Sequence, residues 1–67
     1  MKVREVIQLV ERDGWYLVGQ RGSHRQFHHP TKPGKVTVAG KPSTDVPSGT
    51  LGSILRQAGL AREGESR

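Results

Sequence analysis

The sequence contains no cysteine, which excludes disulfide bonds, thiolate nucleophiles and cysteine-based zinc sites. Aromatic residues are nearly as scarce, with one Trp, one Tyr and one Phe among 67 residues. A chain this short buries only about 60% of the surface that its unfolded form exposes, so Val, Leu and Ile must build a small core. These limits favour one domain of two packed layers, without a deep pocket for a small molecule.

Long hydrophobic runs are also missing. No apolar run approaches the roughly 20 residues that a membrane-spanning helix needs. The N-terminal stretch MKVREVIQLVERDG carries acids and arginines inside its apolar pattern, unlike a secretory signal peptide. The lack of cysteine fits a reducing compartment. We therefore expect a cytoplasmic protein without a membrane partner.

Acidic residues are absent from one long stretch of the chain. Between Gly14 and Thr44 there are five basic residues and no acidic one, whereas the remaining segments hold six of each sign. The net charge of +5 and all three histidines therefore lie in this stretch. A patch of one sign attracts a polyanion, and Lys and Arg at phosphates supply most sequence-independent affinity for nucleic acid. A role in solubility alone is the alternative, because small domains often carry net charges of about 2 to 8.

Apolar residues at helical spacing occur near both ends of the chain. In VREVIQLV they recur at i, i+3, i+4 and i+7, which predicts an amphipathic helix that ends near Asp13, before Gly14. The same spacing in LGSILRQA predicts a second helix, with Ser48 or a neighbour as N-cap and Gly59 as terminator. Residues 1–60 thus form the domain, and residues 61–67 lack an apolar face and are expected to be a flexible tail.

Three short segments between the helices predict strands: WYLVGQ, HRQFHH and KVTVA. Gly22 permits a tight reversal between the first two, and Pro33-Gly34 favours a type II turn before the third. The order is α-β-β-β-α. We expect an α+β fold in which a three-stranded antiparallel sheet carries both helices on one face, because both apolar stripes need the same side of the sheet.

The segment RGSHRQF places His24 directly after the predicted turn. If Phe27 points towards the helices, strand alternation turns His24, Gln26 and His28 to the open face. His24 and His28 are then about 13 Å apart along the strand, too far to share one zinc ion. The stretch offers no carboxylate ligand either, so we expect no metal and no cofactor.

His24 is left with chemistry that needs neither a metal nor a nucleophilic side chain. A serine triad is disfavoured, because Ser23 and His24 point to opposite faces of a strand and the nearest acids in sequence are Asp13 and Asp45. RNA carries its own nucleophile, the 2′-hydroxyl, so its cleavage needs only a base, an acid and cations. A histidine side chain can act as the acid or as the base near neutral pH. On the residues alone, a plain surface histidine remains the simpler interpretation.

Two segments carry a family resemblance that extends from Val3 to Leu60. One is ERDGWYLVGQRGSHRQF, with its Gly-Ser-His motif, and the other is PSGTLGSILRQAGL. In this order the chain resembles the HicA toxins of bacterial type II toxin-antitoxin systems. The resemblance implies a double-stranded-RNA-binding-domain-like fold and an endoribonuclease that cleaves mRNA independently of the ribosome. It also implies a HicB-like antitoxin that covers the active surface.

The resemblance makes His24 the catalytic residue, since it is the histidine of the Gly-Ser-His motif. Phosphate contact is assigned to residues of the basic stretch, namely Arg21, Ser23, Arg25, Lys32, Lys35 and Lys41. Many family members carry a histidine after the third strand, where this chain reads VAGKP. His28 or Lys35 is therefore the candidate for an assisting role.

Two alternatives to the nuclease remain open: a non-catalytic RNA-binding module of the same fold, and a patch that binds only an acidic protein. Trp15 and Tyr16 are expected in the core rather than stacked on a base, because the chain has so few large apolar residues.

Overall fold

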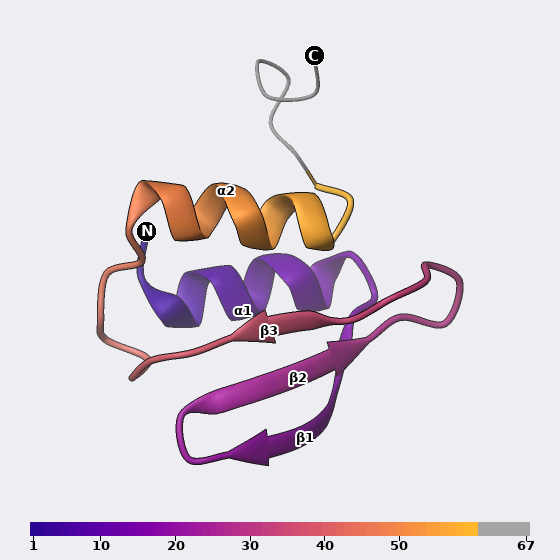
Figure 1. Cartoon of the computed structure of the whole chain (residues 1–67), viewed down its shortest axis with the longest axis horizontal. Helices are drawn as coiled ribbons and strands as arrows, with labels where there is room; N and C mark the ends of the chain where they lie inside the picture. The colour runs from indigo at the N-terminus through magenta and orange to yellow at the C-terminus, as the bar shows by residue number, and fades with distance from the viewer. Residues whose placement is uncertain (61–67) are drawn as a thin grey trace.

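The computed structural model describes residues 1–60, which follow the predicted α-β-β-β-α order (Figure 1). The elements are α1 (Val3–Arg12), β1 (Tyr16–Arg21), β2 (His24–His28), β3 (Val36–Val38) and α2 (Ser48–Gln57). The strands pair antiparallel in the order β1-β2-β3, so β1 and β3 are the edges of the sheet. The predicted fold class is confirmed, whereas the expected tail at 61–67 lies outside the described residues.

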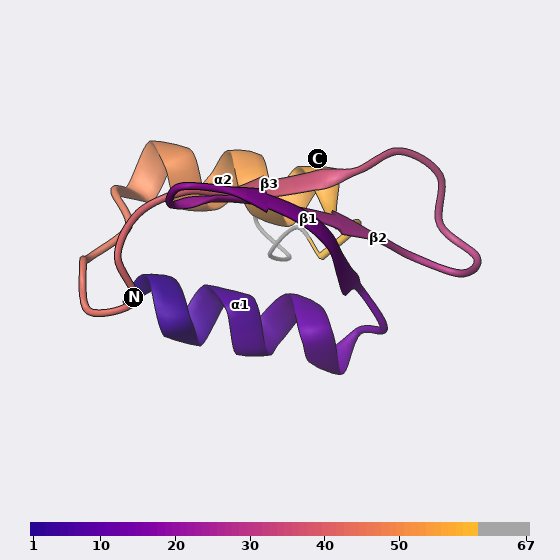
Figure 2. The same ribbon diagram turned by 90° about the horizontal axis from the view of Figure 1, so that it is seen from below.

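Both helices contribute to one apolar core. Helix α1 lies against the sheet, and α2 runs beside the edge strand β3 in the same direction as α1 (Figures 1 and 2). The core comprises Val3, Val6, Val10, Trp15, Phe27, Val36, Val38, Val46, Leu51, Ile54, Leu55 and Ala58. Phe27 therefore points towards the helices as predicted, and the residues that alternate with it on β2 face the other way. Trp15 is buried as expected.

The pairing of β1 with β2 contains one irregularity. Its register shifts between Leu17 and Gly19, so Val18 is an extra residue in β1. A regular strand would turn Tyr16 and Arg21 to opposite faces, because they are an odd number of residues apart. With the bulge, Tyr16 pairs with His28 and Arg21 pairs with His24, and both partners lie on the open face. The bulge therefore places both β1 side chains on the same face.

Two glycines adopt backbone conformations that other residues avoid. Gly22 has a φ of 59° and begins the two-residue turn between β1 and β2, as in type II′ hairpins. Gly14 has a φ of 106° after α1, and a Cβ there would lie 2.8 Å from Nε2 of His29. The predicted helix end and tight reversal are both confirmed. Helix α2 begins at Ser48, and the N-cap is its neighbour Pro47.

Candidate functional site

Arg21 and His24 are cross-strand partners at the turn end of the hairpin. Arg21 is the last residue of β1, His24 is the first of β2, and both are exposed. Residues directly opposite each other in an antiparallel pair have Cβ atoms about 4.5–5.5 Å apart. The guanidinium and the imidazole therefore lie within reach of one bound group.

An open hollow of about 530 Å³ lies at this pair. Its lining is formed by Gln20, Arg21, His24 and Gln26. Gly19 is the register partner of Gln26, so β1 contributes no side chain opposite that glutamine. The hollow therefore offers a cation, an imidazole and the amide of Gln26 to a ligand that approaches from solvent, whereas the Gln20 amide donates to the carbonyl of Gly22 at 3.0 Å.

The side chains of Arg21 and His24 have no partner among the described residues. Within residues 1–60, no carboxylate lies within ion-pairing distance of either side chain. In the same part of the chain, no hydrogen bond occupies a ring nitrogen of His24; the histidine bonds there belong to His29. Both nitrogens of the His24 ring are therefore available to exchange a proton with a ligand.

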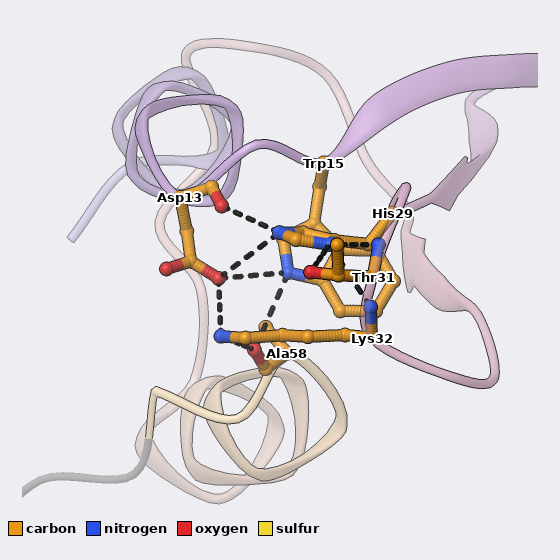
Figure 3. A network of polar contacts seen from close by, with 6 residues as sticks. All are labelled: Asp13, Trp15, His29, Thr31, Lys32 and Ala58. Atoms are coloured by element: carbon orange, nitrogen blue, oxygen red, sulfur yellow. Dashed lines mark hydrogen bonds and ion pairs between the residues drawn. The ribbon is translucent and has the colours of Figure 1, made fainter.

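His29, just beyond the other end of β2, is held by hydrogen bonds (Figure 3). Its Nδ1 accepts from the backbone N–H groups of Thr31, at 3.0 Å, and Lys32, at 3.1 Å. Nε2 therefore carries the proton and donates to the backbone carbonyl of Asp13 at 2.6 Å. The ring also packs edge-on against Trp15, with centroids 5.2 Å apart. His29 is thus a structural residue that joins the end of α1 to the loop after β2.

Lys32 belongs to the same network as His29 (Figure 3). Its ammonium pairs with the carboxylate of Asp13 at 2.5 Å and donates to the carbonyl of Ala58 at 3.1 Å. The hydrogen bond from Lys32 lowers the pKa of the Asp13 carboxyl, and a further bond from Trp15 Nε1 at 3.2 Å acts in the same direction. An RNA phosphate would have to compete with these partners, so the structure does not support the expected phosphate contact at Lys32.

Arg25 faces the inner side of the sheet and ties the hairpin to the loop after β3. Its Nη1 donates to the carbonyls of Ser23, at 3.2 Å, and Gly40, at 2.9 Å. The N–H of Gly40 in turn donates to the Ser23 carbonyl at 3.3 Å. Lys41, which follows Gly40 and is exposed, is thereby brought close to the turn that presents His24.

The other residues predicted for the site are exposed but are not gathered at the hollow. Lys35 precedes β3, whose first residue pairs with Phe27, and His28 lies at the far end of β2. Of the residues predicted for the site, Arg21, Ser23 and His24, with Lys41 nearby, are therefore brought together. Lys32, Lys35 and His28 are not.

Sequence reasoning missed two features of the open face. Gln26 lines the hollow, although it was expected only to share the face with His24. The expectation that Tyr16 lies in the core is wrong, because β1 is the outer edge strand: Tyr16 is 50% exposed, and Leu17 and Val18 are each 48% exposed. Strand alternation from the buried Trp15 was the signal that would have placed Tyr16 outside.

Residues 1–60 contain no group of three or more His, Asp or Glu side chains placed to hold a metal ion. None of the helices in this region has the length and apolar character needed to cross a membrane.

Comparison with known proteins gives one family. The family model described as the HicA toxin of bacterial toxin-antitoxin systems matches residues 3–60 of the 67-residue chain. A search of curated proteins finds no match. The matched range includes every helix and strand of the fold, the turn that presents His24 and all the residues that line the hollow. The chain therefore belongs to the HicA family of toxins of bacterial toxin-antitoxin systems.

Proposed function

We propose that this toxin is a metal-independent endoribonuclease that cleaves mRNA with His24 as its catalytic residue. The observation that carries the proposal is the exposed Arg21 and His24 pair at an open hollow on the face of the sheet opposite the core. Membership of a toxin family supports it, because destruction of mRNA is a direct way to stop growth. The cytoplasm, where mRNA is translated, is the proposed place of action.

The proposed reaction uses the 2′-hydroxyl of RNA as the nucleophile. A base removes the 2′-hydroxyl proton, the oxygen attacks the adjacent phosphorus, and the bond to the 5′-oxygen breaks as that oxygen gains a proton. The products are a 2′,3′-cyclic phosphate and a 5′-hydroxyl. His24 carries out one of the two proton transfers, and Arg21 stabilises the charge that develops on the phosphate oxygens.

Lys41 and Lys35, together with Ser23 and His28, hold RNA on either side of the hollow. Lys41 and Ser23 lie at the turn end, and Lys35 and His28 lie towards the other end of the open face. His28 is about 13 Å from His24 along the strand, so we assign it to a flanking contact that assists binding. Arg25 contributes by holding the turn in place.

A partner antitoxin fits the same face. The family implies an antitoxin in general, and we propose a HicB-like protein that covers the hollow and neutralises the toxin. The exposed apolar side chains of Tyr16, Leu17 and Val18 lie on β1, the edge strand whose other end carries Arg21. Apolar groups gathered on the surface of a small protein mark contact sites, so they suit a protein partner better than a phosphate backbone.

The decisive test is cleavage of a mixed-sequence RNA in EDTA by the wild type, His24→Ala and His28→Ala. His28 is the matched control, because it is a second exposed histidine on the same strand and face. We expect the wild type to produce 2′,3′-cyclic phosphate ends, His28→Ala to produce the same ends with weaker RNA binding, and His24→Ala to lose cleavage. Equal activity of the wild type and His24→Ala would refute the assignment.

A non-catalytic RNA-binding module is the second candidate. Among the four residues that line the hollow, His24 is the single residue of a type that commonly acts as a general acid or base, whereas the reaction needs both an acid and a base. The cleavage experiment described above also distinguishes the nuclease from the binding module. The binding module predicts that the wild type and both variants bind RNA with similar salt dependence and that none of them cuts.

A further inference from the structure

We propose that Gln26 donates a hydrogen bond to a non-bridging oxygen of the phosphate that is cleaved, and that Thr37 is a positioning residue that orients the Gln26 amide. The proposal rests on the proposed nuclease function. It adds a group that stabilises the transition state and a second residue that acts through it.

Gln26 occupies the right place for this role. It follows His24 by two residues on β2, so the two side chains are on the same face about 6.6 Å apart along the strand. Both line the hollow, together with Arg21. Gly19, the partner of Gln26 on β1, has no side chain, and a Cβ built there would meet nothing within 4 Å. The space above the amide is therefore open to a ligand.

The orientation of the amide is set from the other neighbouring strand. Thr37 on β3 is the register partner of Gln26, and its hydroxyl donates to Gln26 Oε1 at 2.9 Å. The amide oxygen is thereby engaged, and the NH2 group remains as a donor. Recognition of a base such as adenine by glutamine uses the oxygen and the nitrogen together. Thr37 occupies one of the two acceptor sites of the Gln26 oxygen, whereas the NH2 group has no hydrogen-bond acceptor within residues 1–60, so the amide suits an anionic oxygen better than the edge of a base.

Thr37 is itself fixed from two sides. Its backbone belongs to the β2–β3 ladder, and its N–H lies 3.4 Å from Oε1 of Gln57 on helix α2. Nε2 of Gln57 donates to Ser53 Oγ at 3.2 Å. A line of contacts therefore runs from α2 through β3 to the hollow, and the amide of Gln26 is oriented before RNA binds.

Preorganised donors matter most where charge develops. During attack by the 2′-oxygen, negative charge grows on the non-bridging oxygens, and a fixed N–H group stabilises this state more than the starting phosphate. Loss of one such donor typically costs about 10²- to 10³-fold in rate in enclosed sites. Because this hollow is open to water, we expect about a 10- to 100-fold loss of cleavage rate and less than about a threefold change in RNA affinity.

The test compares single-turnover cleavage by the wild type, Gln26→Met, Thr37→Val and Thr37→Ser, with circular dichroism to confirm folding. Gln26→Met keeps the length of the side chain and removes the amide. Thr37→Val keeps the shape and removes the hydroxyl, and Thr37→Ser retains the hydroxyl. We expect slow cleavage by the Met and Val variants and near wild-type cleavage by Thr37→Ser.

Phosphorothioate substrates identify the atom that Gln26 contacts. Sulfur in place of one non-bridging oxygen at the cleaved phosphate weakens a hydrogen bond to that position. We expect one of the two phosphorothioate isomers to slow the wild type and to lose this selective effect in Gln26→Met. The comparison is made within each protein, so a partly unfolded variant does not distort it.

The outcomes separate the two proposals. If the wild type cuts through His24 while Gln26→Met cuts as fast, or keeps the isomer selectivity, the Gln26 inference is wrong and the nuclease stands. A changed base preference with intact isomer selectivity assigns Gln26 to base contact and also overturns the inference. If the wild type itself does not cut RNA, the nuclease proposal fails, and the inference that rests on it fails as well.

Discussion

His24 and His29 are five residues apart in the sequence, yet their surroundings differ completely. The side chain of His29 is 9% exposed, and both of its ring nitrogens are hydrogen bonded. His24 is exposed, and within residues 1–60 its ring has no such bonds. His24 begins β2 on the open face, whereas His29 follows the end of β2 and its ring packs against the buried Trp15. The comparison shows that residue type alone does not tell whether a histidine is held inside the fold or is open to a ligand.

The two ends of the hairpin differ in the same way in their charges. At the end near His29, Lys32 is paired with Asp13 and bonded to Ala58, so its charge is compensated inside the fold. At the turn end, Arg21 has no acidic partner in the described part of the chain. One end of the hairpin therefore anchors the helices, and the other presents uncompensated positive charge to a ligand.

The largest expected effect separates the two histidines by activity. His24→Ala is expected to lower RNA cleavage by about a hundredfold or more, because general acid or base catalysis contributes about 10²- to 10⁴-fold. Its unfolding free energy is expected to stay within about 0.5 kcal/mol of wild type, since the side chain that is removed is exposed and makes no hydrogen bond or ion pair within residues 1–60. Rate assays and urea unfolding check the two values. A His24→Ala protein that is strongly destabilised would show that the residue has a structural role.

The second largest expected effect distinguishes His29 from His24 by its contribution to the stability of the fold. His29→Ala removes the acceptor of two backbone N–H groups, the donor to the Asp13 carbonyl and the packing on Trp15. We expect a loss of about 2 kcal/mol, which lowers the Tm of a domain this size by roughly 10 °C. Thermal unfolding measures the shift. His28→Ala is the control and is expected to unfold close to the wild-type temperature, because His28 is exposed.

The third effect compares two cations of the basic stretch. Arg21→Gln is expected to reduce the slope of log affinity for single-stranded RNA against log salt by about 0.7, which corresponds to one lost phosphate contact. Lys32→Gln is expected to leave the slope unchanged and to lower stability, because its ammonium is held by Asp13 and Ala58. Measuring the RNA affinity of both variants over a series of salt concentrations tests these two expectations. Equal changes of slope in both variants would show that Lys32 does reach RNA.

Much of the fold could be predicted from periodic patterns. The apolar spacing of both helices and the glycines that follow them predicted each helix end, because these signals are local. Alternation around Phe27 placed His24, Gln26 and His28 on the open face correctly. The tertiary contacts could not be predicted from the sequence. Lys32 lies 19 residues from Asp13, and no local pattern indicates that the two pair. The bulge at Val18 likewise depends on how β1 pairs with β2, which a single strand does not encode.

The smallest expected effect is the pH dependence of the unfolding free energy that Asp13 contributes at the end of the hairpin near His29. The Lys32 hydrogen bond lowers the pKa of Asp13 below its ordinary value of 3.8, so the folded state favours the ionised carboxylate. The resulting stability is complete above the ordinary value and is lost as the pH falls through the lowered folded value. Asp13→Asn removes this contribution, so the gap in unfolding free energy between wild type and variant is expected to be constant from about pH 7 to 5 and to narrow below about pH 4. Urea unfolding at each pH measures the gap, and Asp45→Asn controls for the loss of an exposed carboxylate that pairs with Lys2. A gap that stays constant down to pH 2 would show that Asp13 contributes through its shape and backbone contacts and not through its charge.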